Sequence, residues 1–331
     1  TATVASTIDA SALTGKLTAT ISDTSTVEVK GGTGDDTINM AALLETNDII
    51  DGGAGTDTLT MTKAALTTQF TNVSNVETVA FSASSGTTAM DVSKLSAGVT
   101  TVQVDVSDSN DNNTAAEVTT ISNHVDQTVN IKHTVDNNGA GVSTNADGAS
   151  VTITSATDTA TDSISIKLDA IDTEANDNGL QTLNVATYET VNIESAKSTT
   201  VTANQAALVT ATNAKSVVIT GDADLTLTDF NNGTALTSLD ASALDGKLVA
   251  TILAAKTAVK MGIDDSTITF ASGSLNNEDS VVGGAGTLDK VIDGGVTGLT
   301  ATTGALVISD VETVALTTSG DNTLDLSAIT G

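Results

Sequence analysis

Two nine-residue segments near the N-terminus combine closely spaced glycines with an aspartate and a following aliphatic residue. They read GGTGDDTIN at residues 31–39 and GGAGTDTLT at residues 52–60. Both fit the pattern G-G-x-G-x-D-x-U-x, in which U is a large aliphatic residue. Glycines allow a tight loop that brings main-chain carbonyls close to an ion. Because Ca²⁺ accepts mixed shells of carbonyl and carboxylate oxygens, the segments predict a calcium site with Asp36 and Asp57 as carboxylate ligands.

The spacing of the two segments predicts how they stack. They begin 52 − 31 = 21 residues apart, and two nonapeptides, about 18 residues, make one turn of a parallel β-roll. We therefore expect one segment to lie above the other, with Ile38 and Leu59 pointing inward from the short strands that follow. The return path reads ETNDIID and adds Glu45, Asp48 and Asp51 as further candidate ligands.

A degenerate pair of the same segments lies near the C-terminus, MGIDDSTI at 261–268 and GGAGTLDKVIDGG at 283–295. In the second of these the acid moves by one place to Asp289. Glycine and aspartate also form β-turns without any metal, and that alternative is stronger for this second pair. The candidate calcium ligands over both pairs are Gly31, Thr33, Asp35, Asp36, Asp48, Asp51, Gly53, Gly55, Asp57, Asp264, Asp265, Gly284, Gly286, Asp289 and Asp293.

The degenerate pair belongs to a longer internal repeat. The segment IDASALTGKLTATI at 8–21 returns as LDASALDGKLVATI at 239–252, and GGAGT returns at the same offset of 231 residues. A third marker, NVETVAF at 75–81, returns as DVETVAL at 310–316, and YETVNI at 188–193 is a further copy. One long unit is therefore repeated in tandem.

These markers predict three parts. Residues 1–81 are a β-roll or solenoid with the two complete nonapeptides, and residues 184–331 are a second solenoid repeat with the degenerate ones. Residues 82–183 have no visible counterpart and are expected to be an inserted β-rich domain with Asp/Asn-rich loops. Both ends of the sequence read as strand, so we expect a fragment of a longer chain.

Alternating apolar and polar residues predict short strands along the whole chain. Examples are LTATI (17–21), VEVK (27–30), TTVQVDV (100–106), TVNIKHTV (128–135), SVTITSA (150–156) and SISIKL (163–168). The few segments of helical composition are MAALLET (40–46), KAALTTQF (63–70) and ANQAAL (203–208). The predicted fold class is mainly β, with parallel β-roll or β-solenoid segments, an additional β-rich domain and little helix.

The composition excludes several kinds of partner. The 331 residues carry 12 basic residues, all lysine, against 41 acidic ones, for a net charge of −29. Without arginine, basic patches or many aromatic rings, we expect no nucleic-acid partner. No stretch approaches the roughly 18 apolar residues of a membrane span, so we expect no direct membrane insertion. The absence of cysteine removes disulfides and thiol chemistry.

No constellation of residues predicts catalysis, and the chain is expected not to be an enzyme. His124 and His133 lie nine residues apart in strand-like segments and are expected to be ordinary strand positions. Carboxylate pairs such as Asp264 and Asp265 lack an aromatic platform for a sugar. The loops VSDSNDNN and DAIDTEANDNG lack the spacing of an EF-hand. They are expected to be solvated loop tips or, alternatively, extra Ca²⁺ sites at contacts between subunits.

At the glycine segments, and across residues 188–244, the chain resembles the calcium-binding surface-layer proteins of Gram-negative bacteria, including those of Caulobacter and Campylobacter. The second stretch begins YETVNIESAKSTTVTANQAALVTATNAK. The resemblance does not extend to residues 82–179.

This resemblance implies an RTX-type repeat protein exported by type I secretion to the cell surface. It implies Ca²⁺ as the bound ion, self-association of one chain into a two-dimensional lattice, and attachment to lipopolysaccharide through a domain outside this sequence. The predicted function is therefore structural. The alternative is a type I-secreted calcium-binding adhesin or effector of the same glycine-repeat class, acting through a module in residues 82–179.

Overall fold

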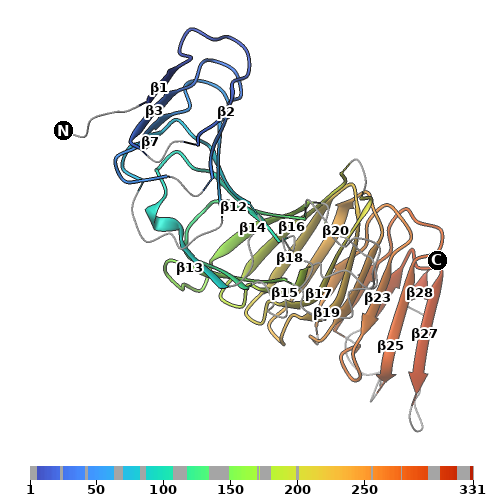
Figure 1. Ribbon diagram of the computed structural model, residues 1–331. Helices are drawn as coiled ribbons and strands as arrows, with labels where there is room; N and C mark the ends of the chain where they lie inside the picture. Colours follow the sequence, from blue (N-terminus) through green and yellow to red (C-terminus); the bar gives the residue numbers. More distant parts are fainter. Residues whose placement is uncertain are drawn as a thin grey trace, which may run out of the picture.

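A computed structural model shows that the chain folds as a parallel β-solenoid (Figure 1). The residues it describes are 6–22, 25–41, 44–62, 70–82, 87–106, 118–133, 149–169, 171, 180–198, 201–254, 256–276, 278–296, 306–318 and 329–330. All strand pairs within these residues are parallel, and every pair joins strands that are two places apart in the chain. The chain therefore winds with two strands per turn, and the mainly β class with parallel solenoid architecture is confirmed.

The strands form three sheets. The four-stranded sheet contains β1 (Ser6–Asp9), β3 (Val27–Lys30), β5 (Ile49–Asp51) and β7 (Val73–Ser74). The 14-stranded sheet, here called the common sheet, contains β2 (Thr18–Thr20), β4 (Thr37–Ala41), β6 (Thr58–Thr62), β8 (Thr78–Ser82), β10 (Thr101–Asp105), β12 (Thr128–Lys132), β14 (Ser163–Asp169), β16 (Thr190–Ala196), β18 (Ser216–Gly221), β20 (Ser238–Leu244), β22 (Ala258–Lys260), β24 (Ser280–Val282), β26 (Val307–Ser309) and β28 (Ile329–Thr330). The ten-stranded sheet contains β9 (Thr87–Asp91), β11 (Val118–His124), β13 (Ala149–Ser155), β15 (Leu180–Asn184), β17 (Ala203–Thr210), β19 (Asp224–Asn231), β21 (Leu248–Ile252), β23 (Thr267–Phe270), β25 (Lys290–Val296) and β27 (Thr313–Thr318). The one helix among the described residues is η1 (Val92–Lys94), a single 3₁₀ turn.

The core consists of rows of stacked aliphatic side chains, here called aliphatic ranks, that run along the solenoid. In the common sheet Val102, Val129, Ile166, Ile193 and Ile219 lie side by side in successive strands, and all five are buried. Alternation along each strand places these residues inward because side chains of a strand point to opposite faces. Burial of each such side chain stabilises the fold by about 1.5–3 kcal/mol.

Threonine occupies the outward position that begins each of the first six strands of the common sheet. A β-branched residue packs well on a pleated, half-exposed surface, which suits threonine to these positions. Six threonines follow one another across this sheet, namely Thr18, Thr37, Thr58, Thr78, Thr101 and Thr128.

The predicted strands are confirmed, whereas the helical prediction at residues 203–208 is wrong. These residues begin β17, which pairs with β15 and β19. Ala206 and Val209 are buried there, so packing of the solenoid overrides the helical propensity of ANQAAL. Of the other two helical predictions, Met40 and Ala41 end β4, and residues 42–43 and 63–69 lie outside the described residues.

The common sheet continues across both predicted domain boundaries. β8 pairs with β10, and β14 pairs with β16, so the strands of residues 82–183 belong to the same solenoid as their neighbours. The Asp/Asn-rich loops at 107–114, 136–148 and 172–179 lie outside the described residues.

The two copies of the repeat use opposite sides of the solenoid. In the first copy the glycine segments connect β3 to β4 and β5 to β6, from the four-stranded sheet to the common sheet. In the second copy they connect β22 to β23 and β24 to β25, from the common sheet to the ten-stranded sheet. Equivalent strands are 22 − 3 = 19 strands apart. Because successive strands alternate between the two faces, this odd number exchanges the faces and places the two sets of glycine segments at opposite ends of the common-sheet strands.

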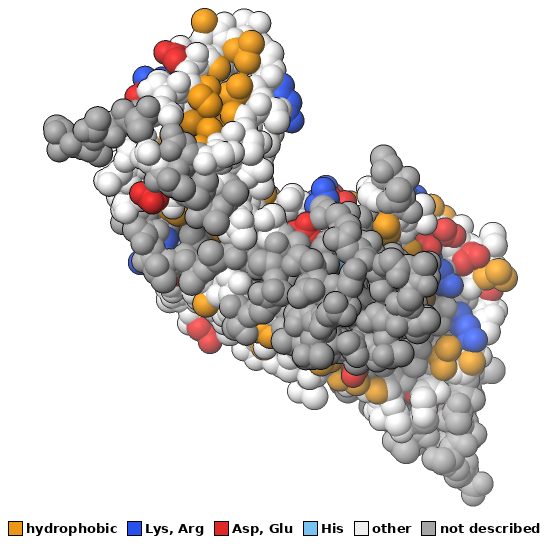
Figure 2. All heavy atoms as spheres, viewed as in Figure 1, with side chains coloured by type: hydrophobic (Ala, Val, Ile, Leu, Met, Phe, Trp, Pro, Cys, Tyr) orange, Lys and Arg blue, Asp and Glu red, His pale blue; other side chains and the backbone are white. Residues whose placement is uncertain are grey.

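The solenoid bends where the four-stranded sheet gives way to the ten-stranded sheet. The four-stranded sheet ends at β7 and the ten-stranded sheet begins at β9, and Figure 1 shows the solenoid changing direction between the N-terminal turns and the remainder. On the face drawn in Figure 2, the lysines lie singly along the molecule instead of gathering into a basic patch. Within the described residues there is no helix with the length and apolar character of a membrane span.

Because the turns stack closely, we expect Gly31→Ala to destabilise the fold strongly. A Cβ atom at Gly31 would overlap the carbonyl oxygen of Gly52 and the Asp36 carboxylate, and such overpacking costs about 3 kcal/mol of unfolding free energy. Gly15→Ala is the matched control, since a Cβ there has no neighbour within 4 Å. Urea unfolding followed by circular dichroism should show a lower midpoint for the first variant only. Equal midpoints would contradict the stacking.

Candidate functional site

The first glycine corner, residues 31–36 and 52–57, is built around a ladder of carboxylates. Asp36 accepts hydrogen bonds from the backbone N–H groups of Leu17, at 2.6 Å, and Gly32, at 2.7 Å. Asp57 accepts from the N–H of Asp36, at 2.7 Å. Each aspartate therefore caps the backbone of the preceding turn. The 21-residue spacing predicts this stacking correctly, because β4 and β6 pair in the register Thr37 to Thr58.

Glu77 closes the ladder, a role that sequence reasoning missed. One of its carboxylate oxygens accepts the backbone N–H of Asp57, at 2.8 Å. Glu77 is the glutamate of the repeated V-E-T-V marker. The other two copies act alike: Glu189 accepts from the N–H of Asp162 at 3.0 Å, and Glu312 from the N–H of Asp289 at 2.7 Å. The threefold recurrence of this marker was the signal that could have revealed the role.

The second glycine corner, residues 261–266 and 283–289, repeats the ladder with one substitution. Ser266 takes the place of Asp36, and its hydroxyl accepts the N–H of Leu248 at 3.1 Å. Asp289 accepts from the N–H groups of Ser266, at 2.7 Å, and Gly284, at 2.8 Å. The inserted residue Leu288 is 67% exposed, so the one-place shift of the acid leaves Asp289 in the ladder position.

A second acid lies on the outer side of each corner. Asp35 accepts the N–H of Thr56, at 2.8 Å. Its counterpart Asp265 accepts the N–H groups of Thr287, at 2.7 Å, and Leu288, at 2.9 Å. These acids tie neighbouring turns together at the surface. Other predicted ligands on the surface are exposed and lie beside them, namely Thr33, Gly55 and Asp264.

Three predicted ligands have different surroundings. Asp48 lies at the other end of β5 and accepts the N–H groups of Val27, at 2.9 Å, and Glu45, at 2.7 Å. Asp51 ends β5 and accepts the side-chain amide of Asn75, at 2.7 Å, and the N–H of Gly53. Asp293 is fully buried inside β25, beyond the corner that holds Asp289 and Gly286.

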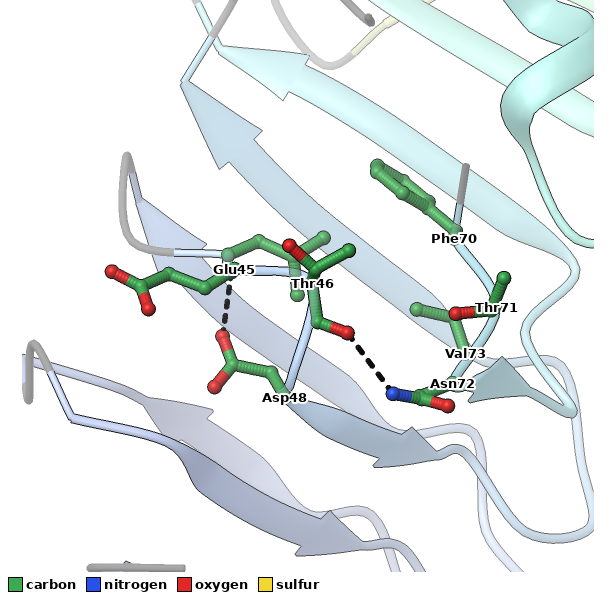
Figure 3. Close-up of a pocket in the computed structure, with 8 residues that line it drawn as sticks. Glu45, Thr46, Asp48, Phe70, Thr71, Asn72 and Val73 are labelled. Atoms are coloured by element: carbon green, nitrogen blue, oxygen red, sulfur yellow. Dashed lines mark hydrogen bonds between the residues drawn. The ribbon is translucent and has the colours of Figure 1, made fainter. Parts of the chain in front are cut away.

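An open cavity of about 230 Å³ lies beside Asp48, between the loops that precede β5 and β7. Figure 3 shows the ring of Phe70 directed toward this space and the carboxylate of Glu45 directed away from it. The side-chain amide of Asn72 donates to the carbonyl of Thr46 in the neighbouring turn, at 3.0 Å. Asp48 faces the loop backbone here, so the structure does not bring it together with Asp36 and Asp57.

Among the described ladder acids, Asp57 has a second carboxylate oxygen that is buried without a donor. It is 1% exposed, and its Oδ2 has no hydrogen-bond partner among the described residues. Burial raises the pKa of Asp57, and the nearby carboxylates of Asp36, Glu77 and Asp35 add to the effect. A buried anionic oxygen without a donor is unfavourable unless a cation or proton satisfies it.

The described surroundings of this oxygen would offer a cation mainly backbone oxygens. A Cβ atom at Gly52 would overlap the carbonyl oxygen of Asn75 and approach Asp57 Oδ2 to 2.6 Å, so two oxygens face the same glycine. Within the described residues no three acidic or histidine side chains converge on one point. A calcium ion at this corner would therefore draw most of its six to eight oxygens from carbonyls and water.

Comparison of the chain with protein-family models, with curated proteins and with solved structures finds no match. The fold class is therefore assigned from the strands and their pairing, and any function must be inferred from the residues of the two glycine corners.

The ladder predicts that Glu77 contributes through its oxygen and not its charge. Glu77→Ala leaves the buried N–H of Asp57 without an acceptor, which costs about 1–3 kcal/mol. Glu77→Gln keeps an amide oxygen in reach and should lose less than half of that. Thermal and urea unfolding of the two variants measure the difference. An equal loss in both would assign the effect to charge and contradict the capping role.

Proposed function

We propose that this chain is a structural protein of a calcium-dependent surface layer on a Gram-negative bacterium, with Ca²⁺ bound at the glycine corners. The observation that carries the proposal is the buried Oδ2 atom of Asp57, which has no donor among the described residues. A divalent cation would supply the positive charge that this oxygen and the neighbouring acids lack.

Electrostatics supports the same proposal. The chain carries a net charge of −29, and like charges at close range oppose compaction. Asp36, Asp57 and Glu77 occupy successive turns of the first corner. Because a ligand that binds only the folded state stabilises it by mass action, calcium would favour the stacked turns over the open chain. Folding outside the cell, where calcium is plentiful, then follows naturally for an exported protein.

The position of the corners suits a lattice. A subunit in a two-dimensional array must contact its neighbours through at least two surfaces. The first and second glycine corners lie at opposite ends of the common-sheet strands. Each corner presents an exposed acid, Asp35 at the first and Asp264 at the second. Ions held between such acids of adjacent subunits would join the same chain on two sides.

Calcium binding is tested with Asp57→Asn. Removing the anionic oxygen should raise the Ca²⁺ concentration at half-saturation about tenfold or more, equivalent to about 1.4 kcal/mol. Asp279→Asn is the matched control, since Asp279 is also buried and burial also raises its pKa, but N–H donors reach both of its oxygens. Calorimetric Ca²⁺ titration measures both. Wild-type calcium affinity in Asp57→Asn would contradict the proposed site.

Lattice formation is tested by electron microscopy of the purified chain. With Ca²⁺ we expect ordered sheets, and with EGTA we expect them to disperse, because the bridging charge is removed. Separate rods in saturating Ca²⁺ would instead favour the calcium-binding adhesin or effector. Unchanged folding and assembly in EGTA would overturn the role of calcium altogether.

A further inference from the structure

The only tyrosine of the chain occupies a position that the repeat elsewhere gives to valine. In the V-E-T-V marker, Val76 and Val311 precede the capping glutamates, and Tyr188 precedes Glu189. All three side chains are buried, Tyr188 to 1% exposure. Valine therefore satisfies the packing at this place, and the phenol introduces a polar hydroxyl that must find a partner in the core.

The partner is one of the two histidines. His124 is 1% exposed, and its Nδ1 lies 3.0 Å from the hydroxyl of Tyr188. The other ring nitrogen, Nε2, lies 2.7 Å from the carbonyl oxygen of Gln127. The two rings meet edge to face, with centroids 5.7 Å apart and an interplanar angle of 79°. Since a carbonyl only accepts, Nε2 carries the proton and Nδ1 accepts from Tyr188.

This pair joins turns that are not neighbours. His124 ends β11, just before the chain enters β12, and Tyr188 lies between β15 and β16. The turn that contains β13 and β14 lies between them in both sheets. The contact thus spans 64 residues of sequence and joins the same corner of the first and third of three consecutive turns.

The backbone at His124 is shaped for the contact. Asn123 has a positive φ of 57°, and the pairing of β11 with β13 shifts register between Ile121 and His124. The side-chain amide of Asn123 donates to Asp91, at 2.8 Å. Asparagine tolerates the left-handed conformation better than most residues do, so this local bulge turns the imidazole inward.

We propose that His124 and Tyr188 form an acid-sensitive staple that locks the centre of the solenoid at neutral pH and opens it in mild acid. Protonation would give His124 a buried charge and a second N–H. Nδ1 would then donate to Tyr188, whose own proton would lose its acceptor. A buried positive charge and a buried hydroxyl without an acceptor are both unfavourable, so they favour opening of the corner at Gln127.

Two acids act on the pair, and the ammonium of Lys215 lies at the intervening corner, where it donates to the carbonyl of Ala160. Asp126 lies on the same corner as His124, and Asp162 lies on the intervening turn and acts on Tyr188. Burial lowers the pKa of His124 from 6.5 and outweighs the Gln127 hydrogen bond and the Asp126 charge, which both favour a protonated imidazole. Burial likewise raises the pKa of Tyr188, so the phenol stays protonated.

The direction of the pH effect follows from this lowered pKa. Between the folded pKa and 6.5, the unfolded chain binds more protons than the folded one. Stability from the pair is therefore complete above pH 6.5 and falls as the pH drops below it, by up to about tenfold in the unfolding equilibrium per pH unit.

Other groups titrate at different pH values or in the opposite direction. The carboxyls of Asp9, Asp91, Asp162 and Asp240 have lowered pKa values and act at lower pH. The raised pKa values of Asp57 and Asp279 act in the opposite sense.

The first test is an NMR titration of the wild-type chain with calcium present throughout. The chain has two histidines, and the spectrum of His124→Gln assigns the resonances. We expect the His124 imidazole to titrate below pH 6.5, together with a loss of hydrogen-exchange protection confined to the corners at residues 124–128 and 185–190. An imidazole that titrates at or above its ordinary value would overturn the staple.

The second test compares unfolding at pH 7 and pH 5. The wild type should lose more stability over this interval than His124→Gln, while the control His133→Gln should follow the wild type. Equal losses in wild type and His124→Gln would overturn the proposal. Because wild-type titration needs no variant, the proposal stays testable even if His124→Gln folds poorly.

Discussion

The N–H groups at the corners of each turn must find acceptors on the next turn. Strand pairing satisfies the backbone within the sheets, but residues that lead into a strand lie outside that pattern, and a buried N–H without an acceptor is costly. Asp36, Asp57 and Glu77 supply those acceptors at one corner. The ladder fixes the register of the turns, and the register in turn brings the aliphatic ranks into contact. The packing of the core therefore depends on acids that lie at the corners of the turns.

Much of this arrangement was predictable from local sequence. The 21-residue spacing places Thr37 opposite Thr58, and Ile38 and Leu59 are buried as expected. Both results follow from local features: the length of one turn, and the alternation of inward and outward side chains along a strand. The role of Glu77 was not predictable in the same way, because a glutamate before a strand reads as a solvated residue until the preceding turn is placed beneath it. The helical composition of ANQAAL likewise carried no information about the sheets on either side.

The exchange of faces lay beyond local reasoning for a different reason. It depends on whether the number of strands between equivalent segments is odd or even, and that number includes every strand of residues 82–183. A sequence comparison detects the repeat at an offset of 231 residues but does not count strands through a stretch with no counterpart. A single added strand in that stretch would return both glycine corners to the same side. The middle region thus sets the relative direction of the two corners, whatever else it does.

The glycine motif carries two requirements that need to be separated. Glycine at position 31 is demanded by the carbonyl of Gly52, and the aspartates are demanded by N–H groups, so turn stacking accounts for most of the pattern without a metal. The second corner shows how far that account extends: Ser266 replaces Asp36 and still caps Leu248. What stacking does not explain is the spare, buried oxygen of Asp57, because a hydroxyl or amide would cap Asp36 without leaving an anionic oxygen behind. An acid retained where a neutral acceptor would serve is the strongest sign at this corner that the carboxylate has a second partner.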